Sequence, residues 1–161
     1  PRARRNPGGG EPCAPRAPRG RRRASSLAPP PAASRVTRGV PSPSVRCLDT
    51  VLPDAVATGY GTSVKIGLSE EGFAERPERA PHHLTRLLER GEPAVLCSHG
   101  PVLPVLFDAL AGIADSSESP AKITLSEVAR RGISKGEAVV AHVVGTGAQA
   151  RVVDVERYPA P

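Results

Sequence analysis

A sharp change of composition at Val36 most constrains how this chain can fold. Residues 1–35 hold nine Arg and eight prolines, and their only large aliphatic residue is Leu27. Such a segment cannot bury enough apolar surface to offset the entropy of ordering it, so we expect residues 1–35 to be disordered. Residues 36–161 are expected to form one partial domain.

Two other interpretations of residues 1–35 stay open. The segment could be a basic arm that touches nucleic acid. It could also be a mistranslated stretch of a GC-rich gene, because the wrong reading frames of such genes encode Arg, Pro, Ala and Gly. We favour mistranslation over a functional arm. The chain contains no Met, even at position 1, so we expect a fragment or an incomplete gene model.

The charge of +6 arises entirely in the first segment. Nine Arg against one Glu give residues 1–35 a net charge of +8, whereas 13 Lys and Arg against 15 acids give residues 36–161 a net charge of −2. We therefore do not expect nucleic acid as a partner of the folded part. The three cysteines are far apart and form no CxxC pair, which predicts reduced thiols in a cytoplasmic protein. No apolar run is long enough for a membrane span.

From Val36 onward, β-rich runs alternate with helical periods, which predicts an α/β fold with a terminal antiparallel hairpin. The expected strands are 35–40, 62–66, 94–97, 138–144 and 149–155. The expected helices are one that starts at Ser42-Pro43 and ends or kinks at Pro53, one that stops near Gly91, and one over 101–110. The unbroken apolar run 94–97 predicts a strand buried on both faces. With only four aromatic residues, the core must come from aliphatic side chains, so we expect modest stability.

Two strand-to-helix corners carry residues suited to binding phosphate. In the first, Ser42 and Pro43 are expected to be the N-cap and the first helical residue, which would place Arg46 in the first helical turn. The helix dipole and the guanidinium would both favour an anion there, although an ordinary exposed Arg is the alternative. In the second corner, His99 ends the strand 94–97, and Pro101 is expected to open the next helix.

Together these corners resemble the histidine phosphatase (phosphoglycerate mutase-like) superfamily. The resemblance rests on Ser42-Pro43-x-x-Arg46-Cys47-x-x-Thr50 and on Cys97-Ser98-His99-Gly100, and it extends from about residue 36 to residue 157. Further similarity, in 68–73, 101–104 and 136–143, is to the C-terminal domain of proteins that join a Nudix (MutT-type) hydrolase to a histidine phosphatase.

The resemblance implies a sheet with flanking helices and a hydrolase that forms a phosphohistidine intermediate on an Arg-His-Gly motif. His99 would hydrogen-bond the transferring phosphoryl group, and Arg46 would neutralise its oxygens. Glu70 or Glu71 would protonate the leaving oxygen, although a solvated turn is the alternative for both. The implied ligand is phosphate or a small phosphorylated metabolite or nucleotide, with no cofactor and no metal.

The sequence departs from the family at its nucleophile. Its histidines are His82, His83, His99 and His142, so none precedes Arg46, and no Arg-His-Gly exists. The Nudix box is also absent. We therefore expect a phosphatase-family domain that is inactive or impaired, and whether it is an enzyme stays open. The alternatives are a non-catalytic phosphate-binding or interaction module, or the C-terminal fragment of a Nudix nucleotide hydrolase.

The missing motif also has a consequence for folding. In the family its strand lies within the sheet, so its neighbours here would expose their edges, and we expect poor stability. The pair His82-His83 does not predict a metal site, because adjacent residues do not share a helix face and no ligand stands at a suitable spacing.

Overall fold

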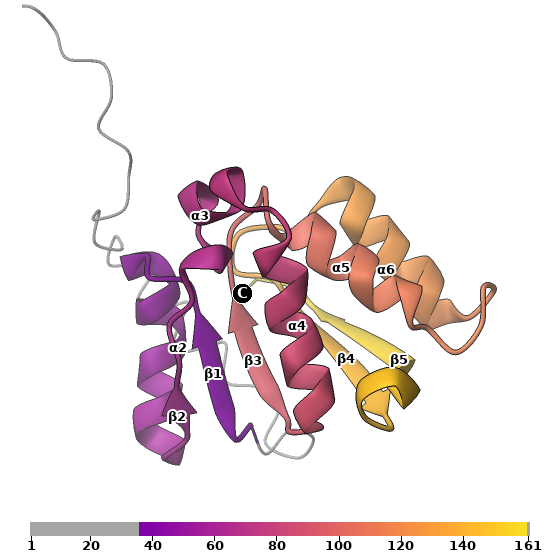
Figure 1. Cartoon of the computed structure of the whole chain (residues 1–161), viewed down its shortest axis with the longest axis horizontal. Coiled ribbons are helices and arrows are strands. Elements are labelled where there is room, and N and C mark those ends of the chain that lie inside the picture. Colours follow the sequence, from indigo (N-terminus) through magenta and orange to yellow (C-terminus); the bar gives the residue numbers. More distant parts are fainter. Residues whose placement is uncertain (1–35, 161) are drawn as a thin grey trace, which may run out of the picture.

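The structure is a computed structural model that describes residues 36–160, so the predicted disorder of residues 1–35 lies outside the described part. The described chain mixes helices with two small sheets (Figure 1): a parallel sheet of three strands and an antiparallel pair. This arrangement confirms the α/β class and the terminal hairpin. Among residues 36–160, no helix combines the length and the apolar character needed to cross a membrane.

The parallel sheet has the order β2-β1-β3, with β1 spanning Arg38–Pro41, β2 Gly61–Thr62 and β3 Ala94–Cys97. Its register pairs Arg38 with Ala94 and Pro41 with Cys97, so β1 and β3 end at the same level. Parallel strands direct their carboxyl ends to one edge of a sheet, which is where open α/β sheets bind ligands. The segments that follow Pro41 and Cys97 therefore leave the sheet side by side.

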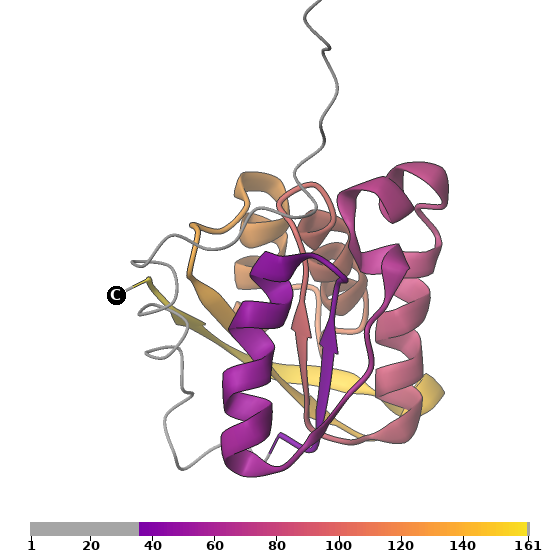
Figure 2. The same cartoon turned by 90° about the vertical axis from the view of Figure 1, so that its left-hand side faces the viewer.

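Helix α2 (Val45–Thr58) covers one face of this sheet, and the helices α3 and α4 lie on the opposite side (Figure 2). The buried residues of α2 are Cys47, Val51 and Ala55, which recur every four residues and so form one stripe along that helix. Gly39 of β1 lets α2 approach closely, because a Cβ there would lie 2.8 Å from a methyl carbon of Val51.

The opposite face is covered by the 3-10 turn η1 (Ile66–Leu68), α3 (Glu70–Glu75) and α4 (Arg79–Arg90). Helix α4 ends at Gly91, whose φ of 64° is the left-handed conformation that glycine adopts without steric cost. The apolar core on this side consists of Val40, Leu68, Ala80, Val102 and Leu106.

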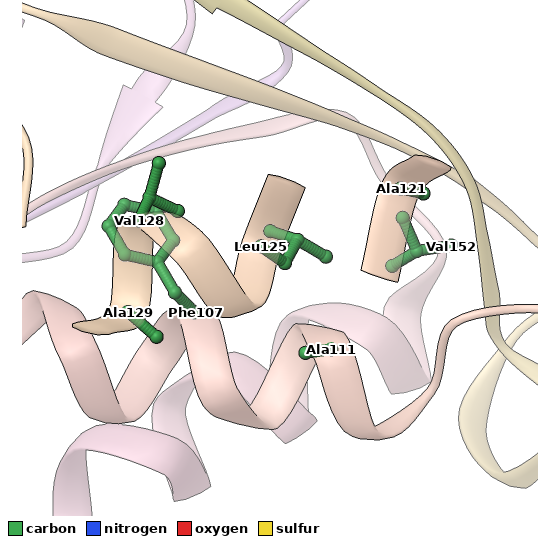
Figure 3. Close-up of a cluster of buried hydrophobic side chains, with 7 residues drawn as sticks. All are labelled: Phe107, Ala111, Ala121, Leu125, Val128, Ala129 and Val152. Carbon is green, nitrogen blue, oxygen red and sulfur yellow. The ribbon is translucent and has the colours of Figure 1, made fainter. Parts of the chain in front are cut away.

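A second core lies between two helices and the hairpin. The helices are α5 (Leu103–Gly112) and α6 (Pro120–Arg131), and the strands are β4 (Ala138–Val144) and β5 (Arg151–Tyr158), joined through the turn η2 (Gly147–Gln149). Figure 3 shows the buried cluster of this core: Phe107, Ala111, Ala121, Leu125, Val128, Ala129 and Val152. Only one of these side chains is aromatic, as the composition predicts.

Three strand edges lack a partner within residues 36–160. Strands β2 and β3 each pair only with β1, and β4 pairs only with β5, whereas β5 also bridges to Ala114 through Val152. Paired edges satisfy backbone N–H and C=O groups, whereas unpaired ones offer a template to another strand.

Several expected boundaries are wrong by a few residues. Ser42 is not the N-cap of α2, because two further residues form the turn and Ser44 occupies that position. Pro101 does not open α5, which begins at Leu103 with Pro104 inside its first turn. Helices α2 and α5 therefore begin about half a turn after Pro43 and Pro101, the residues expected to open them. The residues between each strand and the following helix form the two corners of the candidate site.

Three larger expectations also need correction. Of the two outcomes expected at Pro53, the end of the helix is wrong, because α2 continues to Thr58, with buried Val51 and Ala55 on either side of the proline. The expected strand 62–66 shrinks to Gly61–Thr62, and its remainder turns into η1. Helix α6 was not expected.

The strand 94–97 has the predicted limits, but its four residues are half-buried rather than fully buried, because no described strand covers its second edge.

Candidate functional site

The backbone brings the two predicted corners into contact at the carboxyl end of the parallel sheet. The pairing of β1 with β3 continues one residue beyond the strands, where the N–H of Ser42 donates to the carbonyl of Cys97 at 3.0 Å. Ser42 and His99 therefore emerge next to one another, although 57 residues separate them in the sequence. The N-termini of α2 and α5 follow directly after these two residues, so both helices direct their positive ends toward this corner.

The imidazole of His99 lies at the centre of the corner and contacts three side chains. Its Nε2 shares a 2.8 Å hydrogen bond with the Oγ of Ser42, a side chain with no exposed surface. The Sγ of Cys47 is 3.8 Å from the same nitrogen. On the other side of the ring, Nδ1 is 3.7 Å from the Oε1 of Glu70. The imidazole is thus fixed in orientation by the residue that follows β1 and by side chains of α2 and α3.

The charges of Cys47 and His99 stabilise one another. The pKa of the Cys47 thiol falls from 9.0 to about 4, chiefly through a hydrogen bond with Cys97; burial opposes this shift, and His99 and Ser42 reinforce it. The pKa of His99 is raised above 6.5, first by its hydrogen bond with Cys47 and then, against the effect of burial, by the negative charges of Cys47 and Glu70. The two shifts therefore favour the thiolate form of Cys47 and the imidazolium form of His99.

Arg46 stands in the first turn of α2, as predicted, one residue before Cys47. Its positive charge lowers the pKa of His99, which indicates that the two cationic groups lie within electrostatic reach of one another. Arg46 is half-buried, and Thr50 one turn later donates a hydrogen bond to its carbonyl at 2.7 Å. The corner thus joins a guanidinium, an imidazolium and two helix N-termini.

Of the two predicted acids, the structure brings Glu70 and not Glu71 to His99. Both open α3 and are exposed, but the contact with the imidazole is made by Glu70. Ser69 fixes this helix start, because its Oγ accepts from the N–H of Gly72 at 3.0 Å and donates to the carbonyl of Ile66 at 2.8 Å. A further bond of 2.7 Å, from the Oγ of Ser98 to the carbonyl of Leu68, ties this turn to the end of β3.

Sequence reasoning missed three contributors to the site: Ser42 as the hydrogen-bond partner of His99, Cys47 as its charge partner, and Ser69 as the cap that positions Glu70. A signal for Cys47 was present, because Cys47, Val51 and Ala55 recur at the four-residue spacing of a buried helical stripe. No comparable signal existed for Ser42, whose role depends on the strand register.

The remaining histidines lie elsewhere. His82 and His83 belong to α4, where His83 packs against Gly67, and His142 on β4 hydrogen-bonds Glu156 at 2.6 Å. Within residues 36–160, no group of three His, Cys, Asp or Glu side chains is arranged to hold a metal ion. The chain matches no protein-family model.

Proposed function

We propose that this corner binds the phosphate group of a small phosphorylated metabolite or nucleotide, and that the chain does not hydrolyse the ester through a phosphohistidine. The observation that carries the proposal is the position of His99, held between Ser42 and Glu70 beside the helical turn that bears Arg46. Binding without turnover corresponds to a phosphatase-type domain that has lost its nucleophile.

The electrostatics of the corner support anion binding. Arg46 is permanently charged and carries a planar fork of donors that suits phosphoryl oxygens. The raised pKa of His99 favours the imidazolium form, which adds a second positively charged donor to the corner. The N-termini of α2 and α5 add partial positive charge. A phosphate would compete with the Cys47 thiolate for His99, which predicts modest rather than tight affinity.

Our expectation that these residues do not turn over the ester rests on one missing residue type at the site. Phosphohistidine chemistry needs a second His that attacks phosphorus, and no His precedes Arg46. Glu70 could supply a proton to a leaving group, but proton donation alone does not replace the nucleophile.

Binding can be tested by thermal unfolding in increasing inorganic phosphate. A ligand that binds only the folded state raises the midpoint, and the concentration dependence gives Kd. Arg46→Gln and His99→Gln should each weaken binding on the order of tenfold, the effect of losing one charge-assisted hydrogen bond. Arg130→Gln is the matched control, because Arg130 is exposed on α6 and its loss changes the net charge equally. If all three variants weakened phosphate binding equally, the effect would come only from the loss of one positive charge anywhere on the protein. That result would overturn the proposal.

Turnover is tested separately with p-nitrophenyl phosphate. We expect no hydrolysis above background and no acid-labile phosphoenzyme. Hydrolysis that disappears in His99→Ala, accompanied by such a phosphoenzyme, would show that the domain is an active phosphatase and would overturn the second half of the proposal.

A further inference from the structure

The two cysteines of the described chain lie on the same side of the parallel sheet. Side chains alternate along a strand, and Leu96 packs with Val40 in the core on the α4 side. Cys97 therefore points to the opposite face, which α2 covers, and Cys47 is a buried residue of that helix. The Sγ of Cys47 lies 3.6 Å from the carbonyl oxygen of Ser98, the residue after Cys97.

The surroundings of Cys47 favour its reactive form. Its sulfur lies 3.8 Å from Nε2 of His99, and the Cys97 thiol is close enough to hydrogen-bond it. The resulting low pKa, about 4, makes Cys47 a thiolate at neutral pH, and the thiolate rather than the thiol is the nucleophile in sulfur chemistry. Cys47 itself is 3 % exposed, whereas Cys97 is half-buried, so Cys97 connects the pair to the surface.

We propose that Cys47 and Cys97 form an oxidisable dithiol, a site that a peroxide converts to an intramolecular disulfide beside His99. The reaction does not require the proposed phosphate binding, because neither thiol needs a bound anion, although a bound phosphate would compete with Cys47 for His99. Hydrogen peroxide is the co-reactant that we assign, because it is small enough to enter a nearly closed site.

The reaction has two steps. In the first, the Cys47 thiolate attacks one oxygen of hydrogen peroxide and the O–O bond breaks. The departing hydroxide takes the proton of the His99 imidazolium and leaves as water, so Cys47 becomes a sulfenic acid and His99 becomes neutral. In the second, the Cys97 sulfur attacks the Cys47 sulfur and the S–O bond breaks. The hydroxide leaves as water with the Cys97 proton, and the two sulfurs have together reduced one peroxide to two waters.

The test treats the reduced full-length chain with one equivalent of hydrogen peroxide and maps the cysteines by peptide mass spectrometry. The sequence offers an internal reference, because Cys13 is a third thiol outside the described residues. We expect a cross-link between the peptides of Cys47 and Cys97, with the Cys13 thiol retained and its Cys13→Ser variant behaving identically. A cross-link to Cys13 that forms as fast, or unmodified Cys47 and Cys97, would overturn the proposal.

Two variants test the chemistry without removing the buried Cys47. In Cys97→Ser the second step is blocked, so Cys47 should accumulate as a sulfenic acid that dimedone traps. In His99→Gln the thiolate loses a charge partner and the departing hydroxide loses its nearest proton donor, so oxidation at pH 7 should slow severalfold. Failure to trap a sulfenic acid at Cys47 in Cys97→Ser, confirmed as folded by circular dichroism, would contradict the proposal.

Discussion

The side chain of His99 takes its properties from three neighbours rather than from its own position in the sequence. Ser42 fixes the ring through Nε2, Cys47 supplies the largest stabilisation of the positive form, and Glu70 approaches Nδ1. Arg46 opposes protonation, so the charge state of the imidazole is a balance between two anions and one cation. This balance makes the corner sensitive to pH and to single substitutions.

Phosphate affinity should depend on pH through His99. Because the folded-state pKa of His99 is raised above 6.5, the imidazolium persists to a higher pH than that of a free imidazole and is lost as the pH rises through the raised pKa. The ratio of affinities between the unaltered chain and His99→Gln should therefore be largest on the acidic side of that pKa and fall toward unity on its basic side. Taking the ratio removes the titration of phosphate itself. A ratio that stays constant across that pKa would exclude a role for the imidazolium.

Ser42 should matter for both stability and the site. Its hydroxyl is fully buried and bonded to His99, so Ser42→Ala should cost about 1 kcal/mol of unfolding free energy and weaken phosphate binding. Ser44→Ala is the matched control, because Ser44 occupies the N-cap without a side-chain cap bond and its loss should stay within about 0.5 kcal/mol. Urea unfolding measures both, and equal costs would contradict the assigned role of Ser42.

At the level of elements, local signals succeeded wherever a residue type directly fixes the backbone. The limits of β3 and β4 were predicted to the residue from apolar runs, and the end of α4 follows from the left-handed conformation at Gly91. Helix α6 was missed although Ser119-Pro120 is a cap signature and Ala121, Leu125 and Val128 recur at helical spacing. Because the buried stripe of α6 includes the small residues Ala121 and Ala129, the helical spacing of its apolar residues was not recognised.

Pro53 is a local defect that tertiary packing overrides. Pro53 is exposed inside α2. A proline within a helix destabilises the folded state by about 3 kcal/mol, whereas its restriction of the unfolded chain stabilises the protein by about 1 kcal/mol. Pro53→Ala should therefore stabilise the protein by about 2 kcal/mol in urea unfolding. Pro53→Gly should gain about 1 kcal/mol less, because glycine is a poorer helix former. A destabilised Pro53→Ala would mean that α2 is not continuous through this position.

Helix α6 provides a direct test of the hairpin core shown in Figure 3. Leu125 has no exposed surface, so Leu125→Ala should cost about 2–5 kcal/mol through lost burial and an unfilled cavity. Ile123 on the same helix is 61 % exposed, and Ile123→Ala should change stability by less than about 1 kcal/mol. Comparable losses of unfolding free energy at the two positions would contradict the packing of the Leu125 face of α6 against the hairpin.

At the scale of residues 36–160, β3 and β4 have edges without a described partner strand and the cores are nearly aliphatic, and both features favour low stability. Thermal unfolding should show a low midpoint and concentration-dependent aggregation, because unpaired edges can pair between molecules. Light scattering recorded with circular dichroism would separate the two processes. A sharp, reversible transition above about 60 °C would contradict this expectation.

The sequence by itself determined the class of fold, the terminal hairpin, the limits of β3 and β4, the end of α4 and the presence of Arg46 in a first helical turn. These features depend on period, on turn residues and on helix-start residues, all of which act over a few positions of chain. Only the tertiary structure decided that Ser42, Cys47 and Glu70 surround His99. That arrangement depends on the parallel register of β1 and β3 and on the packing of α2, contacts between residues about 50 apart that no local pattern encodes.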